Sequence, residues 1–455
     1  MMLRLTWVQP EDLVGHELRQ AAQDGRDAAA VERRWLAAGG HLAPERAGAS
    51  GTPATPELRA LAEELLAELA GMPSPLAASE PAAYRSPEAA PAPPAPGAPE
   101  TELSRLHAAW LGRAVGCVLG KPVEKLPLTG IRAIARSTGN WPLTTWFTEQ
   151  GLDPEIAEAY PWNRRSRPTS LAENIDGMPE DDDLNYPLLG LLLLQRHGHD
   201  FTTENVAQLW LDELPAGRTF TAERVAYRNL LAGLEPPLTA TYRNPFREWI
   251  GAQIRADVFG WTNPGDPARA AELAYRDATL THTANGVYGE MFVAAAIAHA
   301  AGPAPTTVHD TLRAALVHVP PHSRYAQAIR LGIETAAAEP TKTPAGFAEV
   351  VDLLHHHYRD HHWVHVLPNA ALLAAALTHA DGDFAGSVTR VVSGGWDTDS
   401  NGATAGSIAG LLAGHPDALG ARWTAPLKNR LATTVGGFDG IGFDELARLT
   451  LEARA

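Results

Sequence analysis

The sequence predicts an all-α protein. Apolar residues recur at helical spacing in almost every segment, alanine is abundant there, and no run alternates β-branched with polar residues as a strand would. Of the 455 residues, 45% are hydrophobic and 20% are charged, which is typical of a globular chain. We expect a large orthogonal helical bundle with a central cleft, preceded by a small helical appendage.

Residues 1–76 are predicted to form that appendage. Short helices are expected after Pro10 and over 27–38, and a third begins at Pro56. Thr55 has the side chain of an N-cap residue and Glu57 lies in the first turn, where an acidic group is favourable. Few apolar residues are available to these helices, so we expect no independent core.

Residues 77–100 are predicted to be a linker, because seven prolines stand among alanines between Ala77 and Pro99. Such a segment cannot pack and favours an extended conformation. The main body then covers 101–455, and deletion of 1–100 is expected to leave it folded. Its helices are predicted over 187–197, 204–214, 221–233, 268–280, 284–301, 309–317, 347–358, 368–379, 402–413 and 443–453.

Charge and cysteine content exclude several classes of protein. The net charge is −16, so the chain has no general affinity for a nucleic-acid backbone. The single cysteine, Cys117, cannot form an intrachain disulfide or a cysteine-based zinc site. The first residues lack the apolar core of a signal peptide, and the longest dense apolar run, Leu188–Leu194, is too short to span a membrane. We expect a soluble, cytoplasmic protein.

Two acidic clusters each precede a helix that lacks a polar face. One lies in Pro179–Pro187 before the run 188–194, and the other in Ser393–Gly402 before the small-residue helix 402–414. Buried carboxylates repel one another and lose hydration, and a hard divalent cation offsets both costs. The clusters therefore predict a metal site, although each could also be an ordinary acidic helix start at the surface. The candidate ligands are Glu180, Asp181, Asp182, Asp397, Asp399 and Ser400.

Four segments between about residues 105 and 415 resemble those of the ADP-ribosylglycohydrolase family, which includes dinitrogenase reductase-activating glycohydrolase and ADP-ribosylserine hydrolases. Gly112–Glu124 is similar to the family's opening element and 180–183 to its Thr-Asp-Asp-Thr motif. Ala284–Met291 is similar to its Gly-Asn-Gly segment, and Gly394–Asn401 to its Gly-Gly-Asp-Thr-Asp-Thr-Asn motif with a tryptophan added.

The chain departs from the family pattern at four positions. Cys117 replaces an aspartate, Glu180 and Asp183 replace threonines, and Ser400 replaces a threonine but keeps a hydroxyl. The two added carboxylates would repel a pyrophosphate nearby if they stay ionised. This looks like a divergent bacterial-type member, and its substrate need not be a modified protein.

The resemblance implies a metal-dependent hydrolase (a glycosidase) that cleaves an N- or O-glycosidic bond at the anomeric carbon of a ribosyl group, most simply of an ADP-ribosyl conjugate. It implies two Mg²⁺, with Mn²⁺ as an alternative, held in the central cleft by the six ligands above. Asp182 or Asp399 would take a proton from the attacking water, and Glu124 would act at the leaving group. Candidate substrate-binding residues are Gly120, Lys121, Asn285, Gly286, Tyr288, Gly395, Trp396 and Asn401.

Other interpretations of these residues stay open. Asn285-Gly286 begins a helix, whose N–H groups would suit a pyrophosphate, but it could be an ordinary N-cap. The histidine tract 355–365 has pairs at helical i,i+4 spacing that could bind Zn²⁺ or Ni²⁺, or it could be a solvated or interface helix. Cys117 could be a nucleophile or a buried hydrophobe. The enzyme could act on a nucleoside-like metabolite, or the chain could bind ADP-ribose or a nucleotide without cleaving it.

Overall fold

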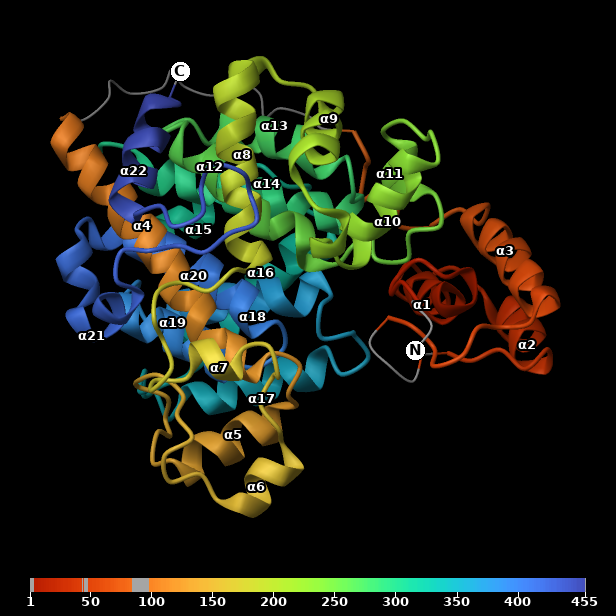
Figure 1. Cartoon of the computed structure of the whole chain (residues 1–455), viewed down its shortest axis with the longest axis horizontal. Helices are drawn as coiled ribbons and strands as arrows, with labels where there is room; N and C mark the ends of the chain where they lie inside the picture. The colour runs from red at the N-terminus through yellow and green to blue at the C-terminus, as the bar shows by residue number, and fades with distance from the viewer. Residues whose placement is uncertain (1–3, 43, 45–47, 84–97, 455) are drawn as a thin grey trace.

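The structure, a computed structural model, describes residues 4–42, 44, 48–83 and 98–454. Within them the chain is all-α, as predicted, and isolated β-bridges such as Met178–Leu431 and Trp249–His365 join single residues. Figure 1 shows a large helical body with a smaller group of three helices at one side. The smaller group consists of α1 (Pro10–Gln23), α2 (Ala29–Ala37) and α3 (Pro56–Ala70).

The body begins with α4 and ends with α22, and it includes helices that periodicity did not single out, such as α5, α16 and α19. Its α-helices are α4 (Pro99–Gly120), α5 (Leu128–Ser137), α6 (Pro154–Ala159), α7 (Arg167–Ser170), α8 (Asp182–His197), α9 (Thr203–Glu213), α10 (Thr221–Leu231), α11 (Leu238–Thr241), α12 (Asp257–Trp261), α13 (Pro267–Ala278), α14 (Ala284–Ala301), α15 (Val308–Leu316), α16 (Arg324–Ala338), α17 (Phe347–His357), α18 (Val366–His379), α19 (Phe384–Ser393), α20 (Thr398–Ala413), α21 (Ala421–Thr424) and α22 (Phe443–Glu452). Short 3₁₀ helices are η1 (Lys121–Val123), η2 (Gly198–Asp200), η3 (Ala216–Arg218), η4 (Ile250–Arg255), η5 (Pro416–Leu419) and η6 (Ala425–Leu427).

The core of the body is made of helices buried on most of their circumference. The sequence predicted this for α8 and α20, and both are buried along nearly their whole length. The alanine-rich helices α14 and α18 are buried to the same degree, which the sequence analysis did not predict. Figure 1 shows α4, α8, α18 and α20 together in the middle of the body.

Glycines spaced four residues apart bring α4 and α20 into backbone contact. A β-carbon at Gly112 or Gly116 of α4 would overlap the carbonyl of Gly406 or Gly402 of α20. At Gly120, the last residue of α4, a β-carbon would overlap the first turn of α20. Larger residues would force the two helix axes apart. The C-terminal end of α4 is therefore held against the N-terminal end of α20.

A buried arginine joins α4 to the start of α8. Pro187 lies inside α8 and has no N–H, so the carbonyl of Asp183, four residues earlier, lacks its helical partner. Arg113 of α4 takes that place, since its Nε donates to the Asp183 carbonyl oxygen at 2.7 Å. The same guanidinium donates to Asp257 Oδ2 of α12 at 2.7 Å. One side chain thus ties three core helices together beside the first acidic cluster.

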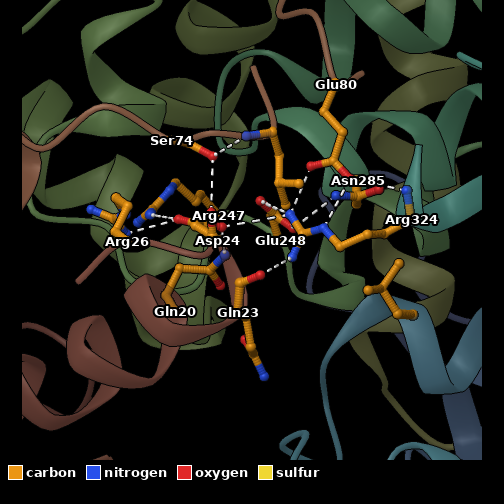
Figure 2. A network of polar contacts seen from close by, with 12 residues as sticks. Gln20, Gln23, Asp24, Arg26, Ser74, Glu80, Arg247, Glu248, Asn285 and Arg324 are labelled. Carbon is orange, nitrogen blue, oxygen red and sulfur yellow. Dashed lines mark hydrogen bonds and ion pairs between the residues drawn. The ribbon is translucent and has the colours of Figure 1, made fainter. Parts of the chain in front are cut away.

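The appendage docks on the body through ion pairs with buried partners. Arg247 donates to Glu17 Oε2 at 2.8 Å and to Asp24 Oδ2 at 2.9 Å, and both acids belong to the appendage. Arg26 of the appendage also bonds to Asp24 Oδ2, at 2.8 Å. Figure 2 shows Asp24 between Arg26 and Arg247. The appendage is therefore held by specific charges of the body as well as by apolar contacts.

The first residues of the predicted linker also contact the body. Glu80 accepts from Arg324 of α16 at 2.7 Å, and Arg324 also donates to Glu248 at 2.9 Å (Figure 2). Residues 77–83 run through turns rather than an extended segment. Residues 84–97, the rest of the predicted linker before α4, lie outside the described residues.

Candidate active site

The two acidic clusters come together where α4, α8 and α20 meet. Lys121 follows α4 and forms an ion pair with Asp181, which precedes α8. The carbonyl of Gly120 accepts from Thr398 Oγ1, at the start of α20, at 2.8 Å. Asp181 and Asp399 are near enough to raise the pKa of the same neighbouring carboxyl, Asp182. The glycine contacts of α4 and α20 thus place the second cluster beside the first.

Asp181, Asp397 and Asp399 are buried, Asp182 is partly exposed, and these carboxylates repel one another. Burial raises the pKa of Asp399 to about 7, and the nearby charges of Glu124 and Asp181 add to the shift. Burial and the charge of Asp399 raise the pKa of Asp397 well above its ordinary value. Burial and the charge of Asp181 do the same to the pKa of Asp182. This is a site with an excess of negative charge, as a cation-binding site has before the cation arrives.

Lys121 compensates Asp181 in particular. The two side chains are 10% and 8% exposed, and the ammonium contacts Asp181 Oδ2. Burial by itself would lower the pKa of Lys121, but the carboxylate of Asp181 outweighs burial and raises it. Burial would raise the pKa of Asp181, and the ammonium outweighs it and lowers that pKa. Both groups therefore stay charged at neutral pH.

Asp183 lies at the inner end of the site, away from solvent. Arg113 Nη2 is 3.8 Å from Asp183 Oδ1, and Cys117 Sγ is 3.7 Å from Asp183 Oδ2. Burial and the charge of Asp181 raise the pKa of Asp183 well above its ordinary value. Burial also raises the pKa of the Cys117 thiol, which is fully buried and therefore unsuited to act as a nucleophile.

Glu180 is bonded to groups outside the carboxylate cluster. Its Oε1 accepts from Asn185 at 2.9 Å, and its Oε2 is 3.1 Å from Arg218. Both oxygens thus have partners outside the carboxylate group, and the expected place of Glu180 among the metal ligands stays a prediction. Ser400, by contrast, is buried in the first turn of α20, and its N–H donates to Asp399 Oδ1 at 3.2 Å.

Glu124 lies at the rim of the site, after η1. Its Oε2 accepts from Asn163 Nδ2 at 2.7 Å, and its Oε1 is 3.0 Å from the ammonium of Lys125. Its charge raises the pKa of Asp182, Asp397 and Asp399, so it faces the buried carboxylates.

Asn369 of α18 orients the second cluster, and the sequence analysis missed it. Its Oδ1 accepts from the Asp397 N–H at 3.1 Å and from Asn401 Nδ2 at 2.6 Å. Its Nδ2 donates to the carbonyls of Trp363 and His365, each at 2.8 Å. Asn401 is fully buried and helps to position this turn, and its predicted contact with a substrate stays a prediction. An asparagine inside an otherwise apolar helix was the available signal.

The segment between α19 and α20 has the unusual backbone that its glycines predicted. Gly395 has φ +78°, and Trp396 has φ +59°, a region that non-glycine residues rarely adopt. The indole of Trp396 stacks on the imidazole of His355, with ring centres 4.0 Å apart and planes 5° apart. His355 Nε2 lies 2.8 Å from the Gly394 carbonyl oxygen. These contacts hold Trp396 next to Asp397 in a strained conformation.

Asn285, Gly286 and Tyr288 lie in the polar network under the appendage, not among the acidic clusters. Thr283, and not Asn285, is the N-cap residue of α14. The Asn285 amide is used internally: Nδ2 donates to Glu248 at 2.9 Å and Oδ1 accepts from the Tyr325 N–H at 2.8 Å (Figure 2). Tyr288 Oη donates to the Pro81 carbonyl at 2.6 Å. The Asn285 side chain is fully buried and already bonded, while the pyrophosphate contact expected from the backbone N–H groups of this helix start stays a prediction.

The histidine tract packs against aromatic rings. His362 stacks on Trp249 at 4.3 Å, and the rings of His361 and His365 are 5.0 Å apart. Burial lowers the pKa of His362 to about 3, and burial lowers the pKa of His361 to about 4. These two histidines are therefore neutral at pH 7. They belong to the layer between the acidic site and the appendage, where His16 of α1 lies 6.1 Å from His362.

The residues present fit a hard divalent cation. Carboxylate oxygens are the ligands that Mg²⁺ prefers, and a cation would relieve the repulsion that raises the pKa of Asp182, Asp397 and Asp399. Ligand atoms of Cys117, Asp181 and Asp183 also lie within 4.8 Å of one another. That group includes a protonated thiol, which is a poor ligand for Mg²⁺. The candidate ligands are therefore the carboxylates of that group, Asp181 and Asp183, and the three acids whose pKa is raised by repulsion.

Comparison with known proteins gives the family of this chain. A model of the ADP-ribosylglycohydrolase family matches residues 98–454, so the chain belongs to that family, as its motifs indicated. A solved structure described as an ADP-ribosylglycohydrolase-related protein complex is similar at 20% identity and a TM-score of 0.48, covering 78% of this chain and all (100%) of its own. Among curated proteins no match is found. Every helix in the described part of the chain is too short or too polar to cross a membrane.

Proposed function

We propose that this chain is a Mg²⁺-dependent hydrolase that cleaves an N- or O-glycosidic bond at the anomeric carbon of a ribosyl group, preferably in an ADP-ribosyl conjugate. The observation that carries the proposal is the buried excess of carboxylates from both acidic clusters. Membership of the ADP-ribosylglycohydrolase family supports the same class of reaction. Mn²⁺ is the natural substitute for Mg²⁺ at a carboxylate site.

The site residues suit the two proton transfers that hydrolysis needs. A divalent cation bound by the carboxylates would hold the ribose hydroxyls and lower the pKa of a water beside the anomeric carbon. With a pKa of about 7, Asp399 can accept a proton from the attacking water near neutral pH. Asp182 is the alternative base. Glu124, at the rim, orients or protonates the leaving group as the glycosidic bond breaks and water adds to the anomeric carbon.

Glu180 and Asp183, the two acids that replace threonines of the family motif, lie beside arginines in this chain. Their pairing favours the ADP-ribosyl substrate. Glu180 is 3.1 Å from Arg218, and Asp183 lies against Arg113 with a raised pKa. Neither added acid therefore presents a free negative charge to a pyrophosphate. Trp396, beside Asp397, offers an aromatic face to a sugar or base, and Lys121 offers an ammonium group.

The test is a side-by-side assay of the purified full chain. ADP-ribosyl peptides and uncharged ribonucleosides are incubated with Mg²⁺, with and without excess chelator, and released products are identified. We expect ADP-ribose from the peptides in Mg²⁺ alone. Faster cleavage of the nucleosides would favour the alternative, a hydrolase of nucleoside-like metabolites.

A calorimetric titration with ADP-ribose separates the second alternative, a protein that binds ADP-ribose without cleaving it. Tight binding combined with no product from either substrate class would contradict the proposed hydrolysis. Activity that persists in excess chelator would contradict its metal dependence.

A further inference from the structure

We propose that the thiol of Cys117 and the carboxylates of Asp181 and Asp183 form a site for a thiophilic divalent cation such as Zn²⁺, distinct from the Mg²⁺ of the proposed reaction. One ligand atom from each of these residues lies within 4.8 Å of the other two, and all three residues are buried. The inference goes beyond the proposed function, because it stands whether or not the chain cleaves a ribosyl bond.

Two of the departures from the family pattern meet in this group. Cys117 stands where the family has an aspartate, and Asp183 stands where it has a threonine. The two side chains face each other from α4 and α8, with Cys117 Sγ 3.7 Å from Asp183 Oδ2. The exchange moves a carboxylate from one helix to the other and introduces a sulfur atom. A sulfur ligand selects Zn²⁺ over Mg²⁺, so the paired change indicates a change of preferred ion.

Asp183 has an oxygen that lacks a hydrogen-bond partner. The residue is only 2% exposed, and its Oδ1 accepts no hydrogen bond from the described part of the chain. Arg113 Nη2 is 3.8 Å away, but that nitrogen donates to the Ile254 carbonyl oxygen at 2.6 Å. A buried carboxylate oxygen without a partner costs free energy, and a bound cation would remove that cost. The oxygen therefore points to a cation at the inner end of the site.

The spacing of the three residues suits a tetrahedral ion. Zn²⁺ binds a cysteine sulfur at about 2.3 Å and a carboxylate oxygen at about 2.1 Å, so its ligand atoms lie about 3.5 Å apart. The 3.7 Å between Cys117 Sγ and Asp183 Oδ2 is close to that separation. Asp181 Oδ1 accepts from the Asp183 N–H at 2.9 Å and Oδ2 contacts Lys121, but each oxygen keeps a second lone pair for an ion. Three protein ligands leave a fourth position to water.

The buried charge balances when such an ion binds. Cys117 and Asp183 release their protons to solvent, so one divalent ion takes the place of two protons. The thiolate and the two carboxylates then carry three negative charges, which balance the ion and the ammonium of Lys121. Arg113 is balanced separately by Asp257 at 2.7 Å. A buried group without net charge avoids the cost of an uncompensated ion.

The site is tested with Co²⁺, which takes the place of Zn²⁺ and reports its ligands by absorption. The full chain is freed of metal and titrated with Co²⁺, and the near-ultraviolet charge-transfer band between a thiolate and Co²⁺ is followed. Cys117 is the only cysteine of the chain, so such a band identifies the ligand. We expect a band that saturates at one Co²⁺ per chain, disappears in excess Zn²⁺ and survives in excess Mg²⁺.

Variants then test the individual ligands. Cys117→Ser should lose the band, and Asp183→Asn should weaken Co²⁺ binding by about tenfold or more. Asp176→Asn is the matched control, because it removes a carboxylate that is 63% exposed and lies outside the group. It should give the band of the unmodified chain at the same Co²⁺ concentration.

Three results would each overturn the inference: no band in the unmodified chain, a band that Mg²⁺ removes as readily as Zn²⁺, or an unchanged Co²⁺ affinity in Asp183→Asn. If a variant does not fold, the spectrum of the unmodified chain decides, because the chain has a single thiol. Since no substrate is involved, a chain that shows the band and cleaves no ribosyl bond would refute only the proposed function.

Discussion

Two groups of buried charge in this protein differ in their balance. Under the appendage, carboxylates and guanidinium groups are nearly equal in number: Glu17, Asp24, Glu80 and Glu248 face Arg26, Arg247 and Arg324. At the acidic site, carboxylates outnumber ammonium groups: Glu124, Asp181, Asp182, Asp397 and Asp399 share Lys121 and Lys125.

The difference separates a structural cluster from a functional one. Paired buried charges hold two surfaces in register, and breaking one pair leaves the other charge without compensation. Unpaired carboxylates destabilise the fold unless a cation joins them, so a protein retains them where the cation serves a purpose. The imbalance, more than the number of acids, is the reason we propose the acidic site as the functional one.

The largest effect is expected when two of the excess carboxylates at the acidic site are removed. Asp397→Ala combined with Asp399→Ala should lower ribosyl hydrolysis by about a thousandfold or more, because the cation loses two of its ligands. The metal-free variant should unfold at a higher temperature than the metal-free parent, since two repelling carboxylates are gone. Product assays and thermal unfolding without metal measure the two effects. Hydrolysis at the parent rate, or a variant that does not fold, would contradict this account.

Breaking the balanced cluster should instead cost stability. Arg324→Met leaves Glu80 and Glu248 buried without their guanidinium, and we expect a loss of about 3–5 kcal/mol in the free energy of unfolding. Denaturant unfolding measures it. Arg330→Met, an exposed neighbour on α16, is the matched control. Adding Glu80→Gln and Glu248→Gln should restore part of the stability; no recovery would show that packing, not charge, carries the effect.

Deleting the appendage and linker removes the acidic partners from the same charge cluster and leaves its arginines in the body. We expect the chain starting at Ala98 to fold with its metal-binding carboxylates in place, as the sequence analysis predicts. Its melting temperature should fall by about 10 °C, because Arg247 and Arg324 lose their acidic partners in the deleted segment. Circular dichroism and Mn²⁺ binding give both readouts. An unfolded product would mean that the appendage completes the core of the body.

The smallest expected effect is a change of metal affinity and of stability with pH. Because the pKa of Asp399 is about 7, its proton must leave before a cation binds, and Mn²⁺ affinity should rise about tenfold from pH 6 to pH 8. In the metal-free chain, this raised pKa means that the folded state binds the proton more tightly than the unfolded state. Stability should therefore fall as pH rises from about 4 to 7. A calorimetric titration at each pH measures the affinity, and a flat profile would contradict the raised pKa.

Sequence reasoning succeeded where the neighbouring residues in the chain determine the environment of a residue. Asp397 and Asp399 are followed by a helix of small residues, and such a helix must be buried, so the burial of the acids could be predicted. It could not find the partners of the Asn285 side chain, because Glu248 and Tyr325 lie 37 and 40 residues away. It could not find the partner of Glu180 either, because an acidic run does not show which of its members turns toward Arg218.

The sequence by itself determined the helical class, the buried helices α8 and α20, and the supply of carboxylates at their starts, because periodicity, residue size and charge act locally. Only the tertiary structure decided which groups of the chain those carboxylates meet. Lys121 reaches Asp181 across 60 residues because Gly112, Gly116 and Gly120 let α4 lie directly on α20. Arg113 reaches Asp183 because Pro187 frees a carbonyl inside α8. Such pairings depend on how closely two helices approach each other in the folded chain, and a local sequence pattern does not specify that separation.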